Sequence, residues 1–103
     1  MHRQSTVPGF PSRVDLLLAR ARRAQQRGER RQALVALREA TLLDESNPKL
    51  WALYGSACVK ANRLEEAERA FAQALFFRQR AHDTGRARAL RSVMERLRLG
   101  RAA

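Results

Sequence analysis

The feature that most constrains this chain is an internal match at a fixed offset of 34 residues. The stretch "LLARARRAQQRGERRQALVALREATLL" aligns without gaps on "WALYGSACVKANRLEEAERAFAQALFF". Under this offset Ala33 falls on Ala67 and Ala40 on Ala74, so small residues recur where two helices must approach closely. A fixed period of about 20 to 50 residues is typical of solenoids and other repeat architectures.

Each block divides at Gly28 or Asn62, two residue types that readily take the left-handed conformation that ends a helix. Apolar residues recur at helical spacing on both sides of each division. The residues that form these four stripes are Val14, Leu17, Leu18, Ala21 and Ala24; Ala33, Leu34, Leu37, Ala40 and Thr41; Leu50, Leu53, Tyr54, Ala57 and Cys58; and Leu64, Ala67, Ala70, Phe71, Ala74 and Leu75. Each block therefore predicts a helix, a tight turn and a second helix.

The second block resembles a tetratricopeptide repeat, whose pattern places Trp, Gly, Ala, Phe and Ala at fixed positions. The residues that match are Trp51, Gly55, Ala67, Phe71 and Ala74. The departures are Tyr54 for the usual Leu, Cys58 for the usual Tyr, and Gln79 for the usual Pro, and the first block is more degenerate. The resemblance implies that Gly55, in the middle of a predicted helix, is a packing residue at the closest helix contact.

We therefore expect an all-α protein, an α-solenoid of tetratricopeptide helix-turn-helix repeats with about five helices. The expected repeats span 14–47 and 48–81, with Asn47 as N-cap and Pro48 as first residue of the third helix. Residues 82–103 are expected to form a capping helix and a short tail, because an end repeat must cover its apolar side. Residues 1–12 are expected to be a flexible tail.

The sequence offers little chemistry for catalysis. Its two histidines, His2 and His82, have neither a Cys nor a carboxylate partner at metal or catalytic spacing. The single cysteine, Cys58, lies on the buried stripe of its helix and is expected to be a small core residue. We expect a protein that is not an enzyme and that has no cofactor or metal.

The net charge of +11 indicates acidic partners. Arginines gather around the first turn and along the last predicted helix, where Arg88, Arg91 and Arg98 form a basic stripe. An Arg-rich, nucleic-acid-associated protein is therefore an alternative, although the interleaved aromatics and reading motifs of such proteins are missing from the sequence. A further alternative is that the arginine excess reflects a GC-rich coding sequence.

The resemblance also implies where a protein partner binds, in a concave groove lined by the first helix of each pair. Carried over by position, the groove residues are Leu18, Arg22, Gln25, Lys49, Ala52, Ser56, Val59, Lys60, Arg86 and Leu90. This apolar floor with basic rims suits an acidic or amphipathic segment. The leading hypothesis is a protein-interaction adaptor, and a small chaperone or assembly subunit that shields a partner helix is another alternative.

Three expectations concern the surroundings of this module. We expect the last helix to cover Phe76; otherwise Phe76 is an exposed contact for a partner. Because about three repeats are usually needed for a continuous core, self-association is an alternative to a stable monomer. Since the sequence has neither a signal-peptide pattern nor an apolar run of about 18 residues, we expect a soluble, cytoplasmic protein without membrane contact.

Overall fold

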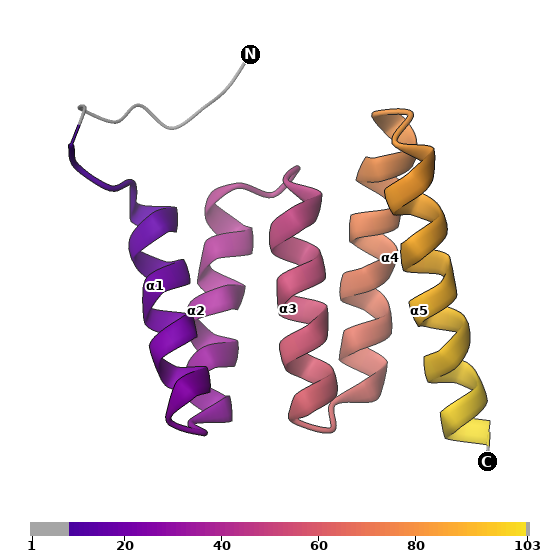
Figure 1. Cartoon of the computed structure of the whole chain (residues 1–103), viewed down its shortest axis with the longest axis horizontal. Helices are drawn as coiled ribbons and strands as arrows, with labels where there is room; N and C mark the ends of the chain where they lie inside the picture. The colour runs from indigo at the N-terminus through magenta and orange to yellow at the C-terminus, as the bar shows by residue number, and fades with distance from the viewer. Residues whose placement is uncertain (1–8, 103) are drawn as a thin grey trace.

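The computed structural model describes residues 9–102 and contains five helices in this range (Figure 1). They are α1 (Arg13–Gln26), α2 (Arg30–Leu43), α3 (Pro48–Lys60), α4 (Leu64–Arg80) and α5 (Thr84–Ala102). The all-α solenoid is confirmed. Most of the tail predicted at 1–12 falls on residues 1–8, outside the described residues.

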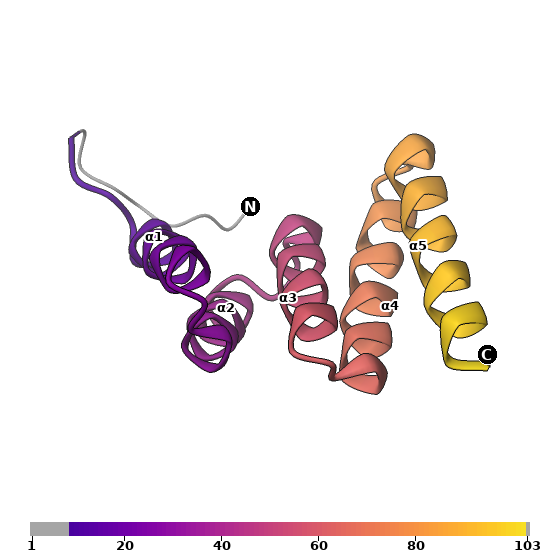
Figure 2. The same ribbon diagram turned by 60° about the horizontal axis from the view of Figure 1, so that its bottom comes forward.

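Each helix packs on its neighbours in the chain, which gives a row of antiparallel helices in two layers. Figure 2 shows α1, α3 and α5 in one layer and α2 and α4 in the other. Figure 1 looks onto the layer of α1, α3 and α5. This zigzag follows from short turns, because a short connection keeps consecutive helices side by side.

Three tight turns share one geometry. Gly28 (φ 72°) and Asn62 (φ 60°) are left-handed, as predicted, and His82 (φ 57°) is a third such residue that the repeat pattern did not predict. In each turn the next N–H donates to a carbonyl five residues earlier, at 2.8 Å: Glu29 to Ala24, Arg63 to Cys58, and Asp83 to Arg78. This is the bond that closes a helix C-terminus when a left-handed residue follows it.

The helix starts also follow the sequence. Ser12 caps α1, with its hydroxyl accepting from the Asp15 N–H at 3.0 Å and the Asp15 carboxylate accepting from the Ser12 N–H. Asn47 caps α3 as predicted, accepting from the Lys49 N–H at 3.0 Å, with Pro48 in the first turn.

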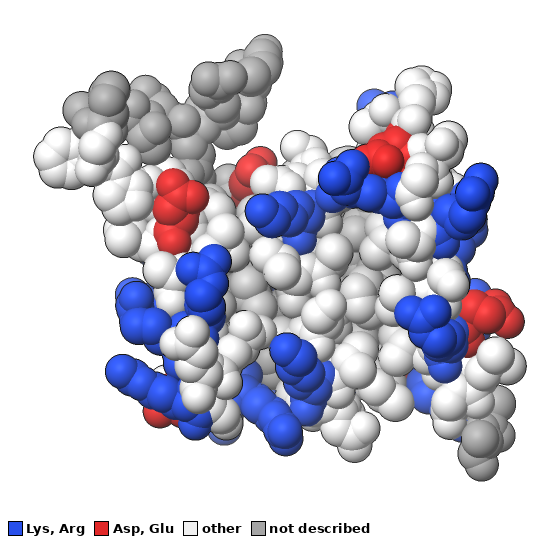
Figure 3. Space-filling model, in the orientation of Figure 1, with Lys and Arg blue, Asp and Glu red and all other residues white. Residues whose placement is uncertain are grey.

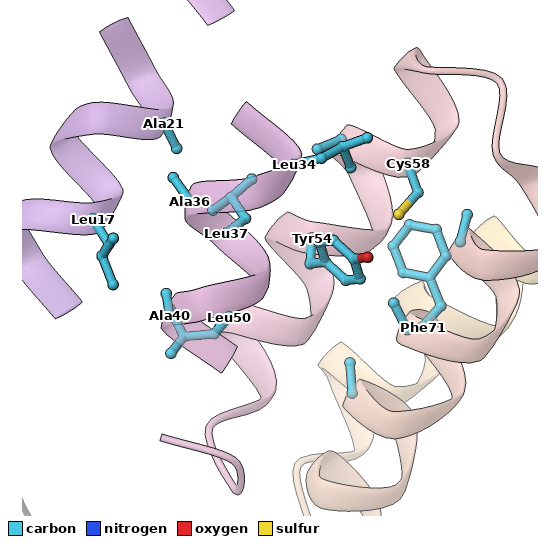
Figure 4. Packing of buried hydrophobic residues seen from close by; sticks show 14 of the residues in the cluster. Leu17, Ala21, Leu34, Ala36, Leu37, Ala40, Leu50, Tyr54, Cys58 and Phe71 are labelled. Carbon is cyan, nitrogen blue, oxygen red and sulfur yellow. The ribbon is translucent and has the colours of Figure 1, made fainter. Parts of the chain in front are cut away.

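The core runs the length of the row, and Gly55 shows how closely α3 and α4 approach. Figure 4 shows the Phe71 ring of α4 directed at α3, next to Cys58. A Cβ on Gly55 would lie 2.7 Å from Cε1 of this ring. Gly55 is a packing residue, as the resemblance implied, and Cys58 is a fully buried core residue as predicted.

Phe76 corrects an expectation, because α5 leaves it 49% exposed. α5 packs on the side of α4 that carries Phe71 and Leu75, whereas Phe76 is turned about 100° from Leu75 along the helix. Its ring stacks edge-on with Phe77 at 5.1 Å, and the Arg80 guanidinium lies 5.5 Å from its centroid.

Candidate functional site

The face of α1, α3 and α5 contains an apolar hollow of about 380 Å³ between α3 and α5. We call this hollow the α3–α5 groove. Its lining residues are Ser56, Val59, Lys60, Phe71, Val93, Arg96 and Leu97. Phe71 reaches it from α4 behind, where its ring is buried against Gly55 of α3.

The predicted groove residues of α3 lie together on one face of that helix. Lys49, Ser56, Val59 and Lys60 are exposed and Ala52 is half-buried, while the opposite face of α3 supplies core residues such as Leu50 and Tyr54. Leu53 lies on the same side as these residues and is 38% exposed. Its exposure corrects the prediction that Leu53 lies on the buried stripe of this helix.

The predicted residues of α1 extend this face toward the N-terminus. Arg22 and Gln25 are exposed, whereas Leu18 is half-buried against the core. These three residues follow one another at intervals of about one helical turn, so they lie on the same side of α1. They add a basic and polar margin beside α3.

The residues of α5 differ most from expectation. Arg86 is exposed and pairs with Asp83 at 3.2 Å, at the start of the helix. Leu90 is only 8% exposed and belongs to the core, so it is not open groove surface. Val93, Arg96 and Leu97 take that role instead.

This difference has a physical cause in the length of α4. The end of α2 at Leu43 is equivalent to Phe77, but α4 continues to Arg80 before it turns. α5 therefore starts later than the repeat offset requires and presents a different face to α3. The apolar spacing of Leu90, Val93 and Leu97 was the signal in the sequence that could have identified the correct face.

The charged side chains around the groove are basic, and most of them form no ion pair within the described residues. Among residues 9–102, no ion pair engages Arg22, Lys49, Lys60 or Arg96, in contrast to Arg86. Figure 3 shows this face with uncharged surface in the middle and lysine and arginine side chains around it. An apolar floor with unpaired cations at its margin attracts a segment that carries both apolar and acidic side chains.

The predicted basic stripe lies apart from the groove. Arg88, Arg91 and Arg98 are exposed, and Arg98 pairs with Glu95 at 3.6 Å. At about 100° per residue, Arg91 and Arg98 lie on the opposite side of the α5 core stripe from Val93 and Arg96. The stripe therefore provides a matched set of charges for control substitutions.

Nothing in the described part of the chain forms a cluster of three or more metal-ligating residues. Burial raises the pKa of the Cys58 thiol, which disfavours the reactive thiolate. Among the described helices, none has the length and apolar character needed to cross a membrane.

Comparison with protein families gives a match to the family model described as tetratricopeptide repeat, over residues 24–93. The matched range begins at the end of α1, contains α2, α3 and α4, and ends at Val93 in α5. The comparison with curated proteins gives no match.

Proposed function

This chain belongs to the tetratricopeptide repeat family, and from that premise we propose that it is an adaptor that binds an acidic, amphipathic segment of a partner protein in the α3–α5 groove. Repeats of this family are generally protein–protein interaction modules. What is proposed beyond the family is the chemistry of the partner and the position of the site.

The observation that carries the proposal is the combination of an apolar floor with unpaired cations. Val59, Val93 and Leu97 offer a place for an aliphatic or aromatic side chain of the partner. Lys60 and Arg96 stand on opposite sides of this floor, on α3 and α5, and are available to carboxylates that flank that side chain. Lys49 and Arg22 extend the positive field along the face, which favours encounter with acidic segments.

The test is a pull-down from lysate with the purified protein, with and without nuclease, at two salt concentrations. A Lys49→Glu/Lys60→Glu variant reverses the charge of Lys60 at the groove and that of Lys49 farther along the same face of α3. An Arg88→Glu/Arg91→Glu variant reverses two charges on the outer side of α5 and serves as the matched control for net charge. All four side chains are exposed, so both variants should keep the fold.

We expect protein partners that survive nuclease treatment, bind the control variant and are lost with the groove variant. Loss with the Arg88 and Arg91 variant alone would move the site to α5. Recovery of nucleic acid alone, with affinity that falls steeply as salt rises, would replace the adaptor function with phosphate-backbone binding.

A further inference from the structure

The opposite face of the molecule carries a second hollow, of about 370 Å³, between α2 and α4. We call it the α2–α4 valley. Its lining residues are Arg38, Thr41, Leu42, Trp51, Tyr54, Glu66, Arg69, Ala70 and Gln73. Trp51 and Tyr54 belong to α3, which lies in the other layer, so they form the floor between the two walls (Figure 2).

The floor of the valley is fixed by hydrogen bonds. The Trp51 indole N–H donates to the Glu45 carbonyl at 2.7 Å, and the Tyr54 hydroxyl donates to the Glu66 carboxylate. The hydrogen bond from Tyr54 is the main cause that lowers the pKa of the Glu66 carboxyl, so this group stays ionised. Because these polar groups are already satisfied, a ligand would meet a preformed surface.

Large apolar side chains are exposed at equivalent positions of the two repeats. Leu42 of α2 lines the valley, and Phe76 of α4 lines an adjoining hollow together with Arg69 and Gln73 of the valley. Leu42 and Phe76 are related by the 34-residue offset, and they are 59% and 49% exposed. Val35, two turns before Leu42 on α2, is 60% exposed. Two helices that run in the same direction, with exposed apolar side chains in or beside the hollow between them, form a channel suited to a helix.

On this face, the acidic and basic side chains of α2 and α4 differ in where they lie and in whether they form ion pairs. The carboxylates outside the valley form ion pairs with arginines that do not line it. Glu39 pairs with Arg13 at 2.7 Å, and both Glu65 and Glu68 pair with Arg101. Inside the valley, Arg38 and Arg69 stand on opposite walls, and among the described residues neither takes part in an ion pair. The valley therefore presents unpaired positive charge, with Glu66 already engaged by Tyr54 and Arg63.

We propose that the α2–α4 valley is a second docking surface, which takes an acidic amphipathic helix of a partner protein while the groove on the other face is free or occupied. Apolar residues of that helix contact Leu42 and Phe76, and its carboxylates pair with Arg38 and Arg69. A second copy of this chain does not fit as well, because its net charge of +11 would meet these same arginines. With two faces, the module can hold two partners at once.

Trp51 gives a direct readout, because it is the only tryptophan of the chain and lines the valley. The probes are a panel of synthetic helical peptides with leucines on one face flanked by glutamates, and the same peptides with lysines in place of the glutamates. Binding is followed by Trp51 fluorescence and, independently, by anisotropy of a dye on the peptide.

Three variants locate the binding. Arg38→Glu/Arg69→Glu reverses the valley charges, and Leu42→Ser/Phe76→Ser removes the large apolar side chains in and beside the valley. Arg88→Glu/Arg91→Glu is the control with the same change of net charge as the first variant. All six side chains are exposed, and circular dichroism checks that each variant keeps its helices. A Lys60→Glu/Arg96→Glu variant tests whether a peptide binds in the groove instead.

The expected result is a saturable change in Trp51 emission with the glutamate peptides only. Each valley variant should weaken this binding about tenfold, while the control and groove variants leave it within about twofold. Failure of the whole panel to change Trp51 emission would overturn the proposal, as would equal loss in the Arg88 and Arg91 control. A dimer seen in sedimentation that dissociates in the Leu42 and Phe76 variant would also overturn it. The same holds for an oligonucleotide whose binding depends on Arg38 and Arg69 but not on Leu42 and Phe76.

Discussion

The contact between Gly55 and Phe71 makes a quantitative prediction for Gly55→Ala. Within a helix, Ala is favoured over Gly by about 1 kcal/mol, so the change alone should stabilise α3. The structure opposes this gain, because the new Cβ would lie 2.7 Å from Cε1 and 2.9 Å from both Cδ1 and Cζ of the Phe71 ring. Ordinary contact begins near 3.4 Å, so the ring would have to recede by about 0.7 Å.

Phe71 cannot recede freely, since it is 3% exposed and packed in the core beside Cys58. Overpacking of a filled core typically costs about 1–3 kcal/mol. We therefore expect Gly55→Ala to lower the free energy of unfolding by about 1 kcal/mol in net terms, measured by urea denaturation. For a domain of this size, that corresponds to a fall in Tm of about 4–8 °C.

Two further variants separate the competing effects. In a Phe71→Leu background the ring is gone, so Gly55→Ala should now be stabilising, by up to about 1 kcal/mol. Gly85→Ala is the control in the first turn of α5, where a Cβ would meet nothing within 4 Å, and it should be neutral or stabilising. If Gly55→Ala stabilised the otherwise unchanged protein, the close contact between α3 and α4 would be refuted.

The remaining predictions concern Tyr54 and His82. Tyr54→Phe should lower the free energy of unfolding by about 1–2 kcal/mol, because it removes the bond to the Glu66 carboxylate from a buried side chain, and thermal unfolding measures this. His82→Gly should raise the free energy of unfolding by about 0.5–1 kcal/mol, because His82 is left-handed. Ala81→Gly should lower it, because the neighbouring Ala81 has a negative φ of −87°. Desolvation by burial raises the pKa of Tyr54 far above its ordinary 10.0, with the Glu66 bond as a second cause, and burial also raises that of Cys58 above 9.0. The folded state therefore holds these protons more tightly, so the contribution of these two groups to stability should be constant below pH 9 and fall as pH rises above it. Tyr54→Phe should reduce the slope above pH 10.

The repeat pattern predicted the architecture because it encodes helix packing directly. Gly28 and Asn62 end their helices by the conformation they favour, and Ala67 and Ala74 permit the close approach that the period implied. These are local or pairwise effects, and one sequence is enough to recognise them.

A capping helix within 82–103 was predicted, but the face that α5 presents could not be predicted in the same way. It depends on where α4 ends, and His82 takes the left-handed conformation without being Gly or Asn, so the third turn carried no strong signal. As a result, the offset of 34 residues assigned Leu90 to the groove, where the structure places Val93 and Arg96.

The α2–α4 valley was missed for a related reason. Its floor combines Trp51 and Tyr54 of α3 with walls from both second helices, so it exists only once the two repeats are stacked. The signals in the sequence were large apolar residues outside the predicted stripes, namely Phe76 in α4 and Val35 and Leu42 in α2.

The most direct test of the groove as the binding site is photo-crosslinking in cells that express the protein with a photoreactive amino acid at Val59 or, in a separate variant, at Arg88. Val59 lines the groove and Arg88 lies on the outer side of α5. We predict that the photoreactive residue at position 59 forms an adduct with a partner protein and that the one at position 88 does not. Mass spectrometry should locate the crosslink in a partner segment rich in acidic and apolar residues. An adduct from Arg88 alone, or nucleic acid joined to both positions, would contradict the account.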